Sequence, residues 1–329
     1  MDPTFSAADW QRLRVLRDRF LTDASEEYWT ERDLELYDAT FARRIGWKWE
    51  GVLDSLTRAH WRPTATRLLD WGCGTGIASR AVAAWSGIGE ATVFDQSGHA
   101  MRFAASALER QNVRAQSSRG EPSITDGTLL LLSHVAGELN DEELTALAKM
   151  AAQADEIIWV EPGSRDISRR LSAAREILRA GGHRFAAPCT HTNPCPVLEP
   201  ENERHWCHFF ARSPTEVFQS PFWREFSTRL EIDLRSLPYS FLASSKTAIP
   251  SLPAHAERLI GRPRELKAHA LLLCCGADGL HERALQKRDE PELFRRVTKK
   301  GADGIFAWKM DPEKPGKVRG GALLDDNVD

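Results

Sequence analysis

The stretch from Asp70 to Gly76, with the sequence DWGCGTG, constrains the fold of this chain more than any other feature. It follows the short apolar run TRLL and precedes IASRAVAAW, whose apolar residues recur at helical spacing. Glycines at alternate positions let a backbone turn sharply and approach a ligand that a Cβ would exclude. The stretch therefore predicts a strand, a loop and a helix, with a ligand-binding site at Asp70, Gly72, Gly74 and Gly76.

A second apolar stretch, ATVFDQS, predicts a strand that ends in an acid about 20 residues after the loop. Asp95 occupies this position, where a carboxylate can accept hydrogen bonds from two ribose hydroxyls. Further patterns alternate along the chain: a helix at 101–110, a strand at 128–134, a helix at 141–152, a strand at 156–161 and a helix at 165–180. Alternation of this kind predicts an α/β fold, with a parallel sheet that helices cover on both faces.

The regions around this sheet are predicted from the same patterns. Apolar residues at helical spacing, among them Trp10, Leu13 and Leu16, predict an N-terminal helical region over 1–62. A Rossmann-like domain is expected over 63–250, with a cysteine-rich insertion at 185–212 and two final strands at 229–234 and 239–244. A small C-terminal region is expected over 251–329, with one apolar strand at 268–274.

The composition is that of an ordinary folded protein, with 42% hydrophobic and 28% charged residues. No apolar run reaches the roughly 18 residues that cross a bilayer, and the start MDPTFSAADW lacks the pattern of an export signal. We therefore expect a cytoplasmic protein without a membrane partner. The net charge of −3 argues against a globally basic nucleic-acid binder, and no DNA partner is expected.

Local basic faces can still bind phosphate, because salt confines the field of a charge to about 10 Å. Arg43, Arg44 and Lys48 follow the N-terminal apolar stripe and are expected to point outward, either toward phosphate or simply into solvent. Residues 281–319 contain eleven Lys or Arg against seven Asp or Glu. This surplus supports contact with RNA modestly, although a solvated tail has the same pattern.

Three of the six cysteines, Cys189, Cys195 and Cys207, lie in a proline-rich segment with no helical or strand periodicity. In a protein that is not exported, such thiols stay reduced, and their clustering favours a metal site or catalysis over disulfides. Coordination of a metal could order this segment where apolar burial is insufficient. A fourth ligand is then required, and we select Cys275, with the neighbouring Cys274 as the substitute.

The spacing of these cysteines does not identify the metal. Four thiolates suit a [4Fe-4S] cluster or zinc, and His191 or His208 could replace one thiolate at a zinc site. Ordinary buried thiols are an alternative. A catalytic nucleophile is another, because RNA cytosine-C5 methyltransferases attack with a thiolate that often follows proline, as Cys189 does. A nucleophile, however, would not need Cys195 and Cys207 beside it.

The loop pattern D-x-G-x-G-x-G resembles the cofactor loop of class I methyltransferases more than the G-x-G-x-x-G loop of dinucleotide dehydrogenases. This resemblance implies a class I methyltransferase fold that binds S-adenosylmethionine through the four loop residues and Asp95. The alternative is a Rossmann-like domain that has kept the loop and no longer binds the cofactor.

Four further motifs follow the loop: VEPGS at 160–164, APCTHTNPCP at 187–196, WCHF at 206–209 and LPYSFLASSK at 237–246. Together they resemble the methyltransferase-like family that assembles the small ribosomal subunit, known from mitochondria and with bacterial members. The resemblance covers most of the chain. It implies a role on small-subunit ribosomal RNA, binding of S-adenosylmethionine, and a [4Fe-4S] cluster whose ligands would be Cys189, Cys195, Cys207 and Cys275.

The sequence assigns no catalytic residue. Glu138, Asn140 and Glu161 follow predicted strands, where open α/β sheets bind ligands, but they could equally cap the helices that come next. The Asn-Pro-Pro-aromatic motif of amino methyltransferases is absent, so no base can be named. Three functions remain open: a ribosomal RNA methyltransferase, a non-catalytic ribosome assembly factor, and a small-molecule methyltransferase with a structural zinc.

Overall fold

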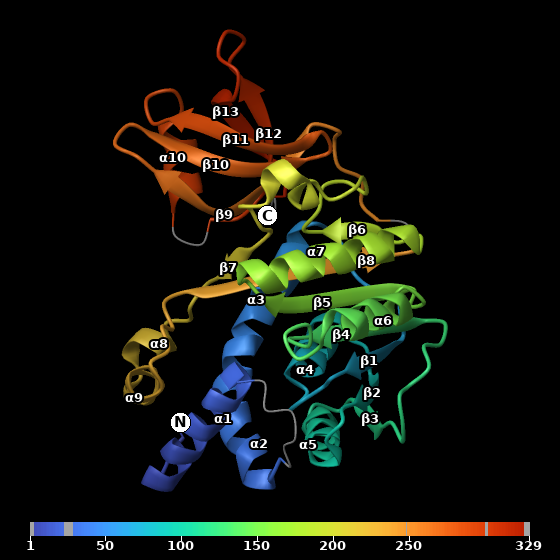
Figure 1. Ribbon diagram of the computed structural model, residues 1–329. Coiled ribbons are helices and arrows are strands. Elements are labelled where there is room, and N and C mark those ends of the chain that lie inside the picture. Colours follow the sequence, from blue (N-terminus) through green and yellow to red (C-terminus); the bar gives the residue numbers. More distant parts are fainter. Residues whose placement is uncertain (1–2, 23–28, 248, 300–301, 326–329) are drawn as a thin grey trace.

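A mixed sheet forms the centre of the molecule, and a separate β-barrel is stacked against one end of it (Figure 1). The computed structural model describes residues 3–22, 29–247, 249–299 and 302–325. The sheet has the strand order β3-β2-β1-β4-β5-β8-β6, and β7 pairs with β8 off this path. Within the described residues, no helix combines the length and the apolar character needed to span a membrane.

The first five strands of the sheet are parallel to one another. Strand β8 pairs antiparallel with β5, and β6 and β7 each pair antiparallel with β8. The parallel strands are β1 (Arg67–Trp71), β2 (Glu90–Phe94), β3 (Arg114–Ser117), β4 (Thr128–Ser133) and β5 (Glu156–Pro162). The others are β6 (Arg184–Ala187), β7 (Phe209–Ala211) and β8 (Leu237–Ser245). The predicted α/β fold, with a sheet that is largely parallel, is confirmed.

Helices cover both faces of this sheet. One face is packed by α3 (Arg43–Arg58), α4 (Ile77–Ser86) and α5 (Gly98–Glu109), and the other by α6 (Asp141–Ala151) and α7 (Arg165–Ala180). Strand β4 shows why both faces are needed: Leu129 and Leu131 belong to one core cluster, and Leu130 and Leu132 to the other. A parallel strand buried on both sides is expected to be apolar at every position.

The N-terminal helices extend the core on the α3 side. They are α1 (Ala7–Thr22), α2 (Glu31–Tyr37) and the π-helical turn η1 (Asp38–Ala42), which runs directly into α3. Trp10 of α1 packs against Phe222, with 5.8 Å between ring centroids. A capping box starts α2, because the side chains of Thr30 and Asp33 each accept a hydrogen bond from the other's backbone nitrogen.

The predicted strand at 229–234 is wrong. Arg229 and Leu230 are the last residues of α9 (Pro221–Leu230), which follows the short helix α8 (Glu216–Gln219), and residues 231–234 form the turn after it. Ser220 caps α9, since its hydroxyl accepts a hydrogen bond from the backbone nitrogen of Trp223. The apolar residues Phe222, Trp223, Phe226 and Leu230 recur at helical spacing and are all buried. The apparent strand is therefore the last part of a helical pattern that begins earlier in the chain.

The C-terminal region is a closed five-stranded barrel in the order β10-β11-β13-β12-β9. Its strands are β9 (Ala256–Glu265), β10 (His269–Gly276), β11 (Gly279–Gln286), β12 (Ile305–Met310) and β13 (Lys317–Leu323), and α10 (Pro291–Thr298) connects β11 to β12. The sequence patterns indicated only β10. A third core cluster fills the barrel, and it includes Leu259, Leu272 and Phe306.

A buried ion-pair network fastens the barrel to helix α3. Arg258 of β9 is 2% exposed, donates a hydrogen bond to Ser55 of α3 at 3.1 Å and forms an ion pair with Asp303 at 2.6 Å. Arg58 of α3 pairs with the same Asp303 at 2.9 Å and with Asp325 at 2.6 Å. Two guanidinium groups from different parts of the fold thus share one carboxylate, which makes the docking depend on charge compensation.

We predict that Asp303→Asn destabilises the protein, because it leaves two largely buried guanidinium groups with Asp325 as their one shared carboxylate and the exposed Asp54 beside Arg58. The free energy of unfolding, measured with urea, should fall by about 3 kcal/mol. The matched control is Asp54→Asn, which removes a 66% exposed partner of the same Arg58 and should cost less than about 1 kcal/mol. Equal effects of the two variants would contradict the network as the docking interaction.

Candidate functional site

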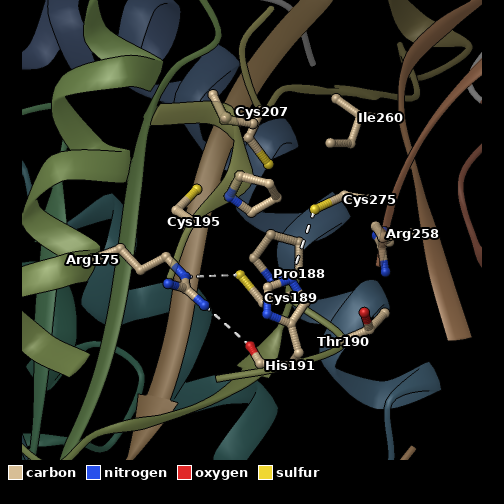
Figure 2. A pocket seen from close by; sticks show the side chains of 12 residues that line it. Arg175, Pro188, Cys189, Thr190, His191, Cys195, Cys207, Arg258, Ile260 and Cys275 are labelled. Carbon is tan, nitrogen blue, oxygen red and sulfur yellow. Dashed lines mark hydrogen bonds between the residues drawn. The ribbon is translucent and has the colours of Figure 1, made fainter. Parts of the chain in front are cut away.

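The four cysteines proposed as ligands line one pocket between the sheet and the barrel (Figure 2). Cys189, Cys195 and Cys207 come from the segment that links β6 to β7, and Cys275 comes from β10. Residues more than 65 positions apart in the sequence therefore meet at one place, which no local pattern could have shown.

Arginines of α7 hold the cysteine-bearing segment in place. Arg169 donates hydrogen bonds to the carbonyl oxygens of Val197, Asn202 and His205, at 2.8, 3.3 and 3.0 Å. Arg165 donates to the carbonyl oxygen of Glu203 at 2.7 Å. Between these anchors lie two single turns, η2 (Pro196–Leu198) and η3 (Pro200–Asn202). The segment is thus ordered by side-chain to backbone hydrogen bonds where it lacks a strand or a long helix.

Strand geometry decides between the two adjacent cysteines of β10. Buried and half-buried residues alternate along this strand, so neighbouring side chains point to opposite sides. Cys274 is fully buried in the barrel core. Cys275 points outward and lines the pocket. The backbone therefore makes Cys275, and not Cys274, available to a shared centre.

Two neighbouring charged side chains of α7 reach the thiol segment: Glu176 accepts a hydrogen bond from the backbone nitrogen of Cys195 at 3.1 Å, and Arg175 contacts a sulfur atom. Arg175 is 1% exposed, and its Nε lies 3.2 Å from the sulfur of Cys189, while another nitrogen donates to the carbonyl oxygen of His191 at 3.1 Å (Figure 2). Burial opposes its charge, but Cys189 and Cys195 outweigh burial and raise the pKa of Arg175. A buried cation here would offset the negative charge of bound thiolates. Sequence reasoning missed this residue, whose only signal is its place on the preceding helix.

Burial also controls the thiols themselves. It raises the pKa of Cys195 to about 11, and raises the pKa values of Cys207 and Cys275 well above the ordinary value, with neighbouring thiols adding to the effect. At neutral pH these three groups are therefore neutral thiols. Binding of a metal would displace their protons, because only thiolates are ligands.

The separation of the sulfur atoms bears on which metal this site could hold. Tetrahedral zinc with bonds of about 2.3 Å holds its sulfurs about 4 Å apart. Among the residues that the structure describes, no three of these thiols lie within 4.8 Å of one another. A four-iron cluster separates its thiolates more widely, because each thiolate binds a different iron. The donor set thus fits a [4Fe-4S] cluster better than zinc.

The two histidines weighed as substitute ligands lie in different places. His191 lines the pocket, with its Nε2 3.9 Å from the sulfur of Cys275. Burial and the nearby Arg175 lower its pKa to about 4, so it is neutral at pH 7. His208 is stacked on Trp206, with 4.6 Å between ring centroids, and is not among the residues that line the pocket.

The glycine loop joins β1 to α4 as predicted from its sequence. Gly72, Gly74 and Gly76 all have positive φ, at 72°, 51° and 74°. A Cβ at Gly72 would lie 2.6 Å from Val135, and one at Gly76 would lie 2.9 Å from Ala104. At Gly74 a Cβ would meet nothing within 4 Å. The outer two glycines are therefore required by packing, whereas Gly74 borders open space where a ligand could lie.

The two acids of this loop region have different roles. Asp70 is fully buried, accepts a hydrogen bond from the backbone nitrogen of Ser79 at 3.3 Å, and has its pKa raised by burial to about 6. Asp95 accepts hydrogen bonds from the backbone nitrogens of Gly74 and Ser97, both at 2.9 Å. Asp70 therefore ties the loop to α4, while Asp95 orients Gly74 and retains lone pairs for further donors.

The glycine loop and the thiol pocket are separate sites. Four strand spacings separate β1 from β6 in the sheet, which corresponds to about 19 Å. Cys189 lies just beyond β6, among the other thiols. A thiolate in that place is too distant to act on an acceptor at the glycine loop, so the structure argues against Cys189 as a methyltransferase nucleophile.

The residues after β4 and β5 have mainly structural roles. Asn140 caps α6, since its side chain accepts hydrogen bonds from the backbone nitrogens of Glu142 and Glu143. Glu161 is fully buried and accepts from the nitrogens of Val135 and Ala136 at 3.1 and 3.0 Å, and from Trp159 at 2.7 Å. Glu138 is exposed beyond them.

Lys48 corrects the expectation that the basic residues of α3 point outward. Its side chain is 9% exposed and its Nζ lies 3.0 Å from Nε2 of His134, because this side of α3 packs against the sheet. Burial lowers the pKa of Lys48 to about 7. Arg43, in contrast, is exposed and pairs with Glu216 at 3.5 Å. The sequence pattern did not distinguish these two residues.

Comparison with known proteins gives one family. The model of the family described as "Mitochondrial small ribosomal subunit Rsm22" matches residues 42–304. Among curated proteins, no sequence matches this chain.

Several solved methyltransferase structures are similar at low identity. Mitomycin 7-O-methyltransferase is 14% identical, with a TM-score of 0.38 over 56% of this chain, which spans only 65% of its length. Magnesium protoporphyrin IX methyltransferase from Synechocystis PCC 6803, with bound S-adenosylmethionine, is 13% identical, with a TM-score of 0.39 over 74% of this chain and 100% of its own. A methyltransferase from Leishmania major is 14% identical, with a TM-score of 0.39 over 72% of this chain and 82% of its own.

We predict that Gly74→Arg abolishes binding of S-adenosylmethionine, lowering the affinity by about 100-fold or more, because the new side chain enters the open space over the loop. Equilibrium dialysis with labelled cofactor measures this. Gly87→Arg is the matched control, because Gly87 also has a positive φ and a Cβ there would meet nothing within 4 Å, but it lies at the other end of α4. Equal loss of binding in both variants would indicate backbone strain alone.

We predict that Glu161→Gln stabilises the protein increasingly as the pH rises from about 4.5 to 7. Burial raises the pKa of Glu161 to about 7, so the folded state binds the proton more tightly than the unfolded state does. The stability from this proton is present below about pH 4.5 and is lost as the pH rises through 7. The free energy of unfolding of the variant, measured with urea, should equal that of the natural protein near pH 4.5 and exceed it by about 2 kcal/mol at pH 8. The exposed Glu142→Gln should show no such trend.

Proposed function

This chain belongs to the family described as mitochondrial small ribosomal subunit Rsm22, and from this membership we propose that it is an S-adenosylmethionine-binding, methyltransferase-like protein that assembles or modifies the small ribosomal subunit and carries a [4Fe-4S] cluster. The observation that carries the proposal is the meeting of Cys189, Cys195, Cys207 and Cys275 in one pocket. The family description supports the small ribosomal subunit as the partner, and our proposal extends this to its ribosomal RNA.

The geometry of the glycine loop supports binding of the cofactor. Gly74 leaves room above the loop, and Asp95 keeps acceptor capacity beside it. Asp95 would hold the ribose hydroxyls, and the free backbone nitrogens at the start of α4 lie next to the loop. When bound, S-adenosylmethionine supplies an electrophilic methyl group. The part of this chain is to hold and orient the two reactants, since methyl transfer depends largely on positioning.

The surroundings of the thiols support a cluster with a structural role. One ligand comes from the barrel and three come from the sheet domain, so the cluster would link the two. Arg175 would balance part of its negative charge, and the wall around it is otherwise largely apolar. Coordination energy adds directly to folding energy when a site joins separate segments. The cluster would therefore hold the barrel in its docked position.

The test is metal analysis of protein purified without oxygen. We expect about four irons and matching acid-labile sulfide per chain, with visible absorption typical of iron-sulfur proteins. Cys195→Ser should lose most of the iron and the colour. Cys274→Ala is the matched control, because Cys274 lies one residue from a ligand but faces the barrel core, and it should keep both. Zinc in place of iron, or full iron in Cys195→Ser, would contradict the cluster.

The ribosomal part is tested with the same preparations. The natural protein should co-sediment with small ribosomal subunits, and the bound fraction should fall as salt is raised, because phosphate contacts release counterions. Failure of the cluster-loaded protein to co-sediment at low salt would contradict the ribosomal assignment and leave the cofactor proposals standing.

A further inference from the structure

The C-terminal barrel has the strand connectivity of an OB-fold. Numbered within the barrel, its five strands close in the order 1-2-3-5-4 and back to 1. Its third and fifth strands, β11 and β13, are parallel, whereas the other neighbouring pairs are antiparallel. The helix α10 lies between the third and fourth strands. All three features are typical of the OB-fold, whose second and third strands and flanking loops bind oligonucleotides or oligosaccharides.

The corresponding face of this barrel continues from the thiol pocket. Along β10, Cys275 points outward into the pocket, and Leu273, Leu271 and His269 follow on the same side. The cysteine-bearing segment covers the Cys275 end through contacts with β11. The other end is half-buried or exposed and leads to the loop 266–268, which joins β9 to β10. One end of the face is thus used for the thiol site, and the other is open.

The charge around the open end differs from that of the whole chain. The segments 262–269, 282–289 and 309–319 contain ten Lys or Arg and five Asp or Glu, although the chain has a net charge of −3. Arg264 and Glu282 pair with each other at 3.6 Å. Four exposed lysines have no ion-pair partner among the described residues, and we call them the lysine rim: Lys267, Lys287, Lys309 and Lys314. A polyanion complements such a surface.

Apolar groups accompany these charges. Within the described residues, the exposed large hydrophobic side chains include Leu266 and Met310, each 42% exposed, one in the loop before β10 and one at the end of β12. Groups of this kind can contact unstacked bases, whereas a folded duplex offers mainly phosphates.

We propose that the open face of the barrel, between the loops 266–268 and 311–316, binds single-stranded RNA, with the lysine rim holding the phosphates. The choice of RNA rests on the proposed function. The commitment to a single strand rests on the fold and on the exposed apolar groups between the charges. The site is distinct from the glycine loop, so the protein would hold RNA whether or not it transfers a methyl group.

The test uses the full, cluster-loaded chain and a fluorescent single-stranded oligoribonucleotide of about twelve nucleotides, within the range that one OB-fold contacts. Lys267→Glu combined with Lys287→Glu should weaken binding about tenfold and reduce the slope of log K against log salt by about 1.4. Lys309→Glu combined with Lys314→Glu should act similarly from the other loop. The control combines Lys149→Glu with Arg224→Glu, two exposed residues of α6 and α9 with the same change in charge, and should bind like the natural protein.

Each result decides the proposal. Binding unchanged in both rim variants, or weakened equally in the control, would overturn it, and so would equal competition by a duplex of the same sequence. Co-sedimentation with small subunits, measured on the same variants, separates this failure from failure of the proposed function. If the natural protein and the rim variants co-sediment equally, the barrel site is wrong and the ribosomal assignment stands. If the natural protein binds the oligonucleotide but not the subunit, the ribosomal assignment is wrong and the barrel site stands.

Discussion

The docking of the barrel on the sheet domain is the constraint on which the rest of the structure depends. Three of the thiols belong to the sheet domain and one to β10, so a four-thiol centre exists only when the two are in contact. Asp303 and Asp325 hold Arg58 and Arg258 at this contact. The ion pairs and the thiols are adjacent at this contact, because Arg258 also lines the thiol pocket and is the partner of Cys275 across β9 and β10.

The cysteine-bearing segment shows how a chain can be ordered without a core of its own. Its carbonyl groups accept hydrogen bonds from arginines of α7, and its sulfur atoms gather around Arg175. These bonds keep the thiols close together in the absence of a metal. A metal centre that then displaces their protons would strengthen an arrangement that the protein already holds.

The two sites serve different parts of the molecule. The glycine loop lies at the middle of the sheet, where strand order reverses, and such a switch point is where open α/β sheets bind ligands. The thiol pocket lies at the sheet edge, about 19 Å away, and borders the face of the barrel. This separation is physically reasonable for a protein that uses one centre to bind a small cofactor and the other to hold two domains together.

The sequence by itself determined the features that local periodicity and glycine geometry encode. The strand, loop and helix around Gly74, the parallel sheet and the clustered cysteines all followed from patterns within a few tens of residues. The prediction from sequence was wrong at 229–234, where the end of a helix and the turn after it have the residue pattern of a strand. It was also wrong at Lys48, whose burial depends on what α3 packs against. Only the tertiary structure decided the closure of the barrel, the outward direction of Cys275, and the presence of Arg175 beside the thiols. These depend on pairings between distant segments, which leave no periodic signal in the sequence because each partner is locally ordinary.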